Sequence, residues 1–212
     1  TQRVDRYRTL PEVLSLDTEL RQALQAPVSA RDVDYLNRKL ERANGASRAS
    51  TLSLINQHGV AVAASNWRAA RSNVGENYSF RPYVKDALAH GSGRFYGIGT
   101  TTGVPGYFLS QAIYDEDGKA IGLVAIKVAL QKLESQWPHA SDIAVVSDEF
   151  GIVFLTSRAE WRYRQLEPLS EQAKAQLQAT RQYEGETLTP LHYRVRKHLE
   201  NGSRLVHIED PV

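Results

Sequence analysis

A lysine inside an apolar run is the strongest chemical signal in the sequence. Lys127 interrupts the segment Ile121 to Val128, whose other members are apolar residues or glycine. Burying an unpaired ammonium group costs on the order of several kcal/mol, so the charge should either reach the exposed face of a strand or meet an anion. An edge-strand lysine in solvent is the alternative to an anion site.

A second cation and a hydroxyl-rich loop precede this strand. Arg81 stands before Pro82, which favours extended backbone at the start of a predicted helix, and Thr100-Thr101-Thr102-Gly103 offers three hydroxyls and close backbone approach. An arginine fork binds one carboxylate in bidentate fashion, whereas a lysine tolerates varied geometry. Two separated cations therefore suit a ligand with two carboxylates, although Arg81 alone could equally be an exposed arginine at a helix start.

Aromatic and hydroxyl side chains surround these groups in the sequence. Tyrosine offers an apolar wall with a polar tip, but in consecutive strands it also serves as core. The residues in question are Tyr78, Tyr83, Tyr107 and Ser110.

The sequence contains none of the common catalytic or metal-binding motifs. There is no Gly-x-Ser-x-Gly, no phosphate-binding loop and no His-Glu-x-x-His, and the six histidines lack ligand spacing. Cysteine is absent, which excludes disulfides and thiol chemistry. The net charge of +2 without a basic cluster argues against a nucleic-acid partner. We therefore predict no metal, no cofactor and no enzymatic activity in this chain.

The first part of the chain has helical character. Thr9-Leu10-Pro11-Glu12 and Ser29-Ala30-Arg31-Asp32 have the spacing of helix starts, and Asn44-Gly45 is typical of a helix end. Pro27 should break the path between the two helices. The apolar stripes of these helices predict packing on the sheets of the chain or on a partner helix.

Strand patterns begin at residue 51 and predict a class of α+β. Two strand runs at 51–56 and 60–65 form a hairpin, a helix follows at 81–90, and three more strands run over 94–99, 107–114 and 119–128. The segment 55–65 resembles 146–157, with the same spacing from glycine to serine. We therefore predict a helical segment over 1–48 and two sheet modules over 49–139 and 140–212.

The chain contains no run of 18 apolar residues that could span a bilayer. It lacks methionine altogether and starts at Thr1, which indicates a domain excised from a longer protein.

Together these segments resemble the extracytoplasmic sensor domains of bacterial four-carbon-dicarboxylate sensor histidine kinases, the double-Cache or PDC type. The likeness is most specific between Tyr78 and Lys127 and weakens after about Leu169. The matching stretches include Leu36 to Glu41, Ala63 to Trp67, Val74 to Tyr83, Gly93 to Thr101, Gly103, Gly106 to Phe108, Val124 to Val128, Asp148, Gly151 to Leu155 and Trp161-Arg162.

This resemblance implies a fold with a long N-terminal helix and two stacked PAS-like antiparallel sheet modules, the membrane-distal module binding the ligand. It implies that Arg81 and Lys127 hold ligand carboxylates, and that the pocket is completed by Tyr78, Thr100, Thr101, Gly103, Tyr107 and Ser110. It further implies a periplasmic domain of an inner-membrane protein, anchored by flanking segments outside this chain, joined to a cytoplasmic kinase and homodimeric in the full-length receptor.

The expected ligand is succinate, fumarate, malate or 2-oxoglutarate, and the signal should pass along the linking helix near 130–137 or along the N-terminal helices. One alternative keeps the fold but changes the ligand to an amino acid, which would need a carboxylate for the ammonium group; Asp86 is the nearest candidate. A second alternative is an enzyme with a cryptic hydrolytic site.

Overall fold

The structure, a computed structural model, describes residues 2–26, 29–47, 49–129, 145–198 and 204–209. Its helices are α1 Gln2–Ser15, α2 Thr18–Gln25, α3 Ala30–Ser47, α4 Pro82–His90, the 3₁₀ turn η1 Ala159–Trp161 and α6 Glu171–Thr180. Its strands are β1 Thr51–Asn56, β2 Ala61–Ala64, β3 Ser92–Ile98, β4 Pro105–Tyr114, β5 Ala120–Ala129, β6 Val145–Ser147, β7 Val153–Thr156, β8 Arg164–Gln165, β9 Thr189–Pro190, β10 Tyr193–His198 and β11 Arg204–Ile208.

These elements confirm the α+β class, and the chain divides into two compact units. The first unit is Thr1–Leu130 with Ala179–Gln182, and the second is Gln131–Gln178 with Tyr183–Val212. The boundary predicted between 139 and 140 lies outside the described residues, as do Pro27 and the linking segment 130–137. The division into three segments, 1–48, 49–139 and 140–212, therefore stays a prediction.

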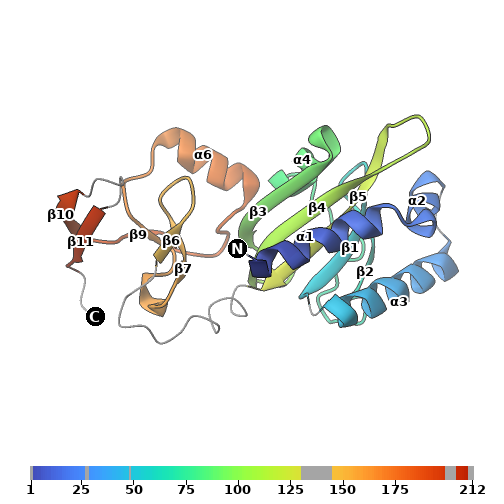
Figure 1. The fold of residues 1–212 in the computed structure, drawn as a ribbon, viewed down its shortest axis with the longest axis horizontal. Coiled ribbons are helices and arrows are strands. Elements are labelled where there is room, and N and C mark those ends of the chain that lie inside the picture. The colour runs from blue at the N-terminus through green and yellow to red at the C-terminus, as the bar shows by residue number, and fades with distance from the viewer. Residues whose placement is uncertain (1, 27–28, 48, 130–144, 199–203, 210–212) are drawn as a thin grey trace. The chain divides into compact units, whose positions relative to one another are not determined.

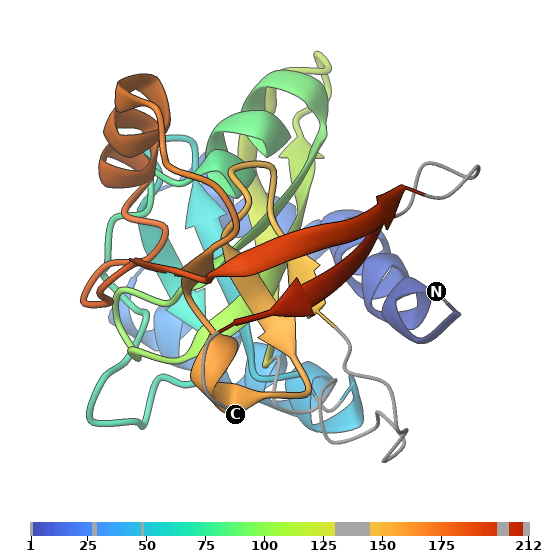
Figure 2. The ribbon, with the colours of Figure 1, turned by 90° about the vertical axis from the view of Figure 1, so that its left-hand side faces the viewer.

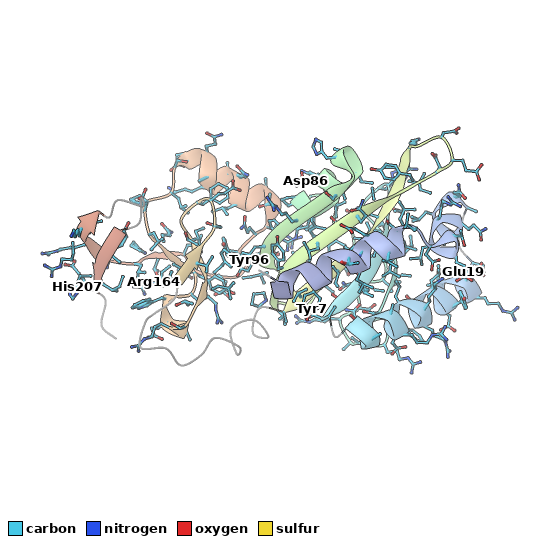
Figure 3. All side chains as sticks on the ribbon, in the orientation of Figure 1. Tyr7, Glu19, Asp86, Tyr96, Arg164 and His207 are labelled. Carbon is cyan, nitrogen blue, oxygen red and sulfur yellow. The ribbon has the colours of Figure 1, made fainter. Side chains whose placement is uncertain are left out.

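The first unit is built on a five-stranded antiparallel sheet in the order β2-β1-β5-β4-β3. Helices α1 and α3 run along it in Figure 1, and the apolar residues of α1, α2 and α3 pack on one face of the sheet. This helical face is formed by Tyr7, Leu20, Leu36 and Leu40 from the helices and by Leu52, Leu54, Leu109, Ile113, Val124, Ile126 and Val128 from the strands. Tyr7 is labelled on α1 in Figure 3.

Helix α4 covers the opposite face of the same sheet. Its residues Tyr83, Val84 and Ala87 pack against a second set of strand residues, which comprises Ile55, Phe95, Phe108, Leu123 and Ala125. The two sets alternate along each strand, as expected for a sheet buried on both faces. We call this second face the α4 face.

Two predicted helix boundaries near the N-terminus are wrong. Thr9 does not begin a helix, because α1 starts at Gln2 and contains Pro11 in its interior. The burial of Tyr7 on the sheet shows that packing outweighs the local proline signal. Asn44-Gly45 does not end the second helix, since α3 continues to Ser47. Ser29 does cap α3, because its hydroxyl accepts a hydrogen bond from the Asp32 amide.

A charged cluster connects α2 to α3. Asp17 caps α2 by accepting hydrogen bonds from the amides of Glu19 and Leu20 at 3.0 and 3.2 Å. The ammonium of Lys39 on α3 contacts both Asp17, at 2.7 Å, and Glu19. Figure 3 labels Glu19 at this end of the first unit. The cluster holds α2 against α3 so that their apolar residues face the sheet.

The second unit contains short strand pairs and one helix. Strands β6 and β7 pair antiparallel, as do β10 and β11, whereas β8 and β9 pair in parallel. Figure 2 shows the β10–β11 pair, in red, along its length. Val153, Trp161 and Leu191 form the small core of this unit.

Candidate functional site

The candidate site lies on the α4 face of the five-stranded sheet. Residues opposite one another on neighbouring strands share a face, and Lys127 of β5 pairs with Thr51 of β1 and with Phe108 of β4. Phe108 pairs in turn with Phe95 of β3. The four side chains form one row across the sheet. The lysine is therefore central and buried, with 6 % of its surface exposed, and the solvated edge-strand alternative is wrong.

The ammonium group of Lys127 is held by the threonine loop. Its Nζ donates to Thr102 Oγ1 at 2.9 Å and to the Val104 carbonyl at 2.6 Å, and it lies 5.6 Å from the centroid of the Phe108 ring. Burial lowers the pKa of Lys127 to about 8, and the charge of Arg81 adds to that shift. The ammonium group is therefore available to pair with an anion but is poorly stabilised without one.

Tyr78 joins the same loop from the other side. Its hydroxyl lies 2.6 Å from Thr101 Oγ1 in a shared hydrogen bond. Burial raises the pKa of Tyr78 to about 12, against the effect of this hydrogen bond, so the phenol stays neutral and can donate. Burial likewise raises the pKa of Tyr83. The two phenols are thus neutral hydrogen-bonding groups at physiological pH.

Backbone geometry shapes the loop that carries these threonines. Gly103 has a φ of 68°, in the left-handed region, and its amide donates to the Gly99 carbonyl at 2.7 Å. The Gly99 amide donates to the Val104 carbonyl at 3.0 Å. Gly103 therefore closes a tight turn between β3 and β4, which presents the threonine hydroxyls.

Arg81 is the most deeply buried charged group of the described chain, at 1 % exposure. It occupies the N-cap position of α4 with extended backbone, as Pro82 predicted. Its Nη1 donates to the carbonyls of Thr180 and Arg181 at 3.0 and 3.2 Å, and its Nη2 donates to the Ile98 carbonyl. The exposed helix-start interpretation of Arg81 is therefore wrong.

A small cavity lies between the threonine loop and the row that contains Lys127. Its volume is about 20 Å³, enough for about one water molecule. It is lined by Thr51, Asn73, Tyr78, Tyr83, Gly99, Thr100, Thr101, Thr102, Phe108 and Lys127. Hydroxyls, an amide and an ammonium dominate this lining, and none of these residues is acidic. Such a set suits an anion.

Four predicted site residues line the cavity, namely Tyr78, Thr100, Thr101 and Lys127. The other four do not line the cavity, namely Arg81, Gly103, Tyr107 and Ser110. Arg81 is occupied with backbone carbonyls, and Gly103 shapes the loop from an exposed position. Tyr107 packs with the apolar set of the helical face, because it precedes Phe108 and so points to the opposite side of β4.

Ser110 has a contact that the sequence did not suggest. Its hydroxyl donates to the Tyr83 carbonyl at 2.6 Å and lies 3.2 Å from the Gly93 carbonyl. It shares the α4 face with Lys127 but connects α4 to β3. Its predicted role as a ligand contact stays a prediction.

Thr51, Asn73, Gly99 and Phe108 line the cavity but were not predicted. Phe108 had a signal, since strict alternation along β4 places it on the face opposite Tyr107. No sequence signal indicated Thr51, because only the pairing of β1 with β5, two segments far apart in the sequence, brings it beside Lys127. Asn73 reaches the site through a bond from its Nδ2 to Ser53 Oγ at 3.1 Å.

The described residues contain no group of three or more histidine, aspartate or glutamate side chains arranged to hold a metal ion. Within the same residues, no helix has both the length and the apolar character needed to cross a bilayer.

Comparison with known proteins finds similar sequences and similar solved structures. The C4-dicarboxylate transport sensor protein DctB of Rhizobium meliloti (strain 1021) is 35% identical over 200 residues, covering 94% of this chain and 32% of that protein. The protein of the same description from Pseudomonas aeruginosa is 34% identical over 186 residues, covering 88% and 30%. This chain thus spans about a third of the length of these relatives.

The structural comparison agrees. The crystal structure of the V. cholerae histidine kinase DctB sensor domain superposes with a TM-score of 0.86 at 27% identity, covering 94% of this chain and 77% of that one. No family model matches the chain.

Proposed function

We propose, from the premise that this chain belongs to the family of DctB sensor domains, that it binds a small dicarboxylate or 2-oxodicarboxylate between Lys127 and Arg81. The single observation that carries the proposal is a buried lysine facing a hydroxyl-lined cavity, with a buried arginine close enough for its charge to lower the lysine pKa. A dianion would relieve the repulsion between these two cations.

The ligand would replace hydrogen bonds that the site residues now make within the protein. One carboxylate would take the Lys127 ammonium, with hydroxyl donors from Thr101, Thr102 and Tyr78 around it. The other carboxylate would engage the fork of Arg81, whose two terminal nitrogens now donate to backbone carbonyls. Both ends of the ligand would then be charged and buried, which favours a diacid over a monoacid.

An amino acid fits this lining less well. Its ammonium group would need a carboxylate, and the described cavity lining contains none. Asp86, labelled on α4 in Figure 3, is half-buried and does not line the cavity. The diacid is therefore the better match for the charges of this site.

The test is calorimetry of the purified domain with succinate, 2-oxoglutarate, butyrate and valine. We expect saturable binding of at least one diacid and much weaker binding of butyrate and valine. Removing one member of a buried charge pair costs about 2–5 kcal/mol, so Lys127→Met should weaken diacid binding by roughly a hundredfold. Lys119→Met, in the exposed turn of the same hairpin, is the matched control and should bind as the wild type does.

Binding of valine without binding of any diacid would contradict the proposal. Turnover of a bound diacid, followed by NMR of the incubated mixture, would support the enzyme alternative instead. In the whole protein we place this domain in the periplasm, as the non-catalytic sensor part of a homodimeric membrane histidine kinase that transmits ligand binding across the membrane. Its membrane segments and kinase would lie outside this chain.

A further inference from the structure

The carbonyls that occupy Arg81 belong to a segment far from it in sequence. Arg81 Nη1 donates to the carbonyls of Thr180 and Arg181, the residues that end α6 and follow it. These residues belong to the first unit together with Arg81. The contact therefore joins the candidate site to the end of a helix whose preceding residues lie in the second unit.

The same segment also covers the end of an edge strand. The Gln182 carbonyl accepts a hydrogen bond of 2.8 Å from the amide of Ile98, the last residue of β3. The Ile98 carbonyl in turn accepts from Arg81. Residues 180–182, which we call the Arg81 strap, are thus fixed at one end of the sheet by Arg81 and by Ile98.

The strap holds a strained backbone. Arg181 has a φ of 52°, a conformation that costs any residue other than glycine free energy and that asparagine tolerates best. The guanidinium carbon of Arg181 lies 5.0 Å from the centroid of the Phe80 ring, and that of Arg81 lies 5.3 Å from the same ring. The closed strap therefore depends on contacts that offset the strain at Arg181.

The residue after the strap is anchored in the second unit. The hydroxyl of Tyr183 donates to Asp148 Oδ2 at 2.6 Å, and Asp148 Oδ1 accepts hydrogen bonds from the amides of Phe150 and Ile152 at 3.0 and 2.9 Å. A displacement of the strap is therefore passed along the backbone in two directions. It reaches the β6–β7 turn through Tyr183 and reaches α6 through Thr180.

We infer that the strap competes with the ligand for Arg81, so that ligand binding releases residues 180–182. This inference rests on the proposed function. A carboxylate pairs with two parallel N–H groups of a guanidinium and carries full charge, so it outcompetes neutral carbonyls for the same nitrogens. Only molecules with an open strap can bind, so the apparent affinity of the ligand falls in proportion to the open fraction. The ligand in turn shifts the equilibrium to the open form, because it binds that form more tightly.

Two substitutions at one position test the competition without changing a group that meets the ligand. Arg181→Asn and Arg181→Val both remove the guanidinium from Phe80, but asparagine favours the left-handed backbone of the closed strap and valine opposes it. We expect succinate to bind the valine variant roughly three- to tenfold more tightly than the asparagine variant in calorimetry. Equal affinities, or the reverse order, would overturn the inference.

Amide exchange in the wild-type protein provides a test that needs no variant. With succinate the Ile98 amide should lose protection, because its acceptor leaves with the strap, while the amides of Gly99 and Gly103 should not lose theirs. If the protein binds succinate but the protection of the Ile98 amide is unchanged or increased, strap release is refuted and the proposed function is not. A wild-type protein that binds no diacid would refute the proposed function and the inference together.

Discussion

The pH dependence of ligand binding should come from the titration of Lys127. Its pKa is lowered to about 8 by burial and then by the charge of Arg81. A bound carboxylate supplies the opposite charge and raises that pKa again. Above pH 8 the ligand-free protein has lost a proton that the complex keeps, so binding must take up a proton.

We therefore expect diacid affinity to be constant below about pH 7.5 and to fall as pH rises through about 8, by up to roughly tenfold per unit. Titrations at pH 8.5 in buffers of different ionisation enthalpy should show proton uptake. Lys127→Met should lose this pH dependence. A wild-type affinity that does not change between pH 7 and 9.5 would show that Lys127 does not titrate in the site.

The same pKa has the opposite consequence for the ligand-free fold. An unfolded lysine titrates at its ordinary pKa of 10.5, so between about 8 and 10.5 the unfolded chain binds a proton that the folded chain has released. Stability then rises with pH across this window, by about 3 kcal/mol in total from this group. The difference in urea unfolding between wild type and Lys127→Met, followed against pH, isolates this contribution.

Substitution of Ser110 can distinguish a residue that stabilises the site from a residue that contacts the ligand. Ser110→Ala removes the hydrogen bond to the Tyr83 carbonyl and leaves that buried acceptor without its hydroxyl donor, which should destabilise the fold by about 1–3 kcal/mol. We expect a lower melting temperature with diacid affinity changed by less than about threefold. Ser92→Ala, at an exposed position of β3, is the control. A large loss of affinity at unchanged stability would instead make Ser110 a ligand contact.

At the scale of the elements, strand alternation decides which side chains can meet. Hairpins, turns and the helix α4 could be predicted from local patterns, because each depends on neighbouring residues. The face of Tyr107 could not be fixed in the same way, since it depends on the register of β4 with β5. Thr51 lies beyond any local signal, because only the pairing of β1 with β5 brings it beside Lys127.

Two glycines give the Lys127 side chain its path over the sheet. A Cβ at Gly106 would lie 2.6 Å from Lys127 Cε and 2.8 Å from its Cγ, and one at Gly99 would lie 2.7 Å from its Nζ. The lysine stem therefore passes over Gly106, and its ammonium group lies above Gly99. Each glycine leaves space that a methyl group would fill.

Gly106→Ala should consequently move the ammonium group while disturbing mainly a flexible side chain. We expect diacid affinity to fall by roughly tenfold or more with a small change in melting temperature, measured by calorimetry and thermal unfolding. Gly93→Ala is the contrasting variant, because its Cβ would lie 2.3 Å from the Tyr83 carbonyl oxygen and should destabilise the fold. Unchanged affinity in Gly106→Ala would mean that the ligand does not need the present path of Lys127.

At the scale of the whole molecule, the candidate cavity lies in the first of two units. The α+β plan, in which N-terminal helices are followed by an antiparallel sheet, could be predicted from the change in period at residue 51. The contact of Arg81 with Thr180 could not, since it spans 99 residues and involves backbone carbonyls that have no sequence signature.

Ligand should stabilise the two units unequally. At about 100 times the dissociation constant, a ligand adds about 2.7 kcal/mol to the unfolding of the part that binds it. We expect native-state amide exchange to show this increase in β4 and β5 and little change in β7. Lys127→Met should abolish it. An equal increase in both units would show that they unfold together.

The small volume of the cavity has a consequence for response time. Small-molecule sites commonly measure about 300–1,000 Å³, whereas this one measures about 20 Å³ and holds its lysine against Thr102 and Val104. A diacid can enter only after the loop has moved, so the observed association rate should level off at high ligand concentration instead of rising in proportion to it. The frequency of loop opening, and not diffusion, would then set the shortest change in ligand concentration that the domain can register.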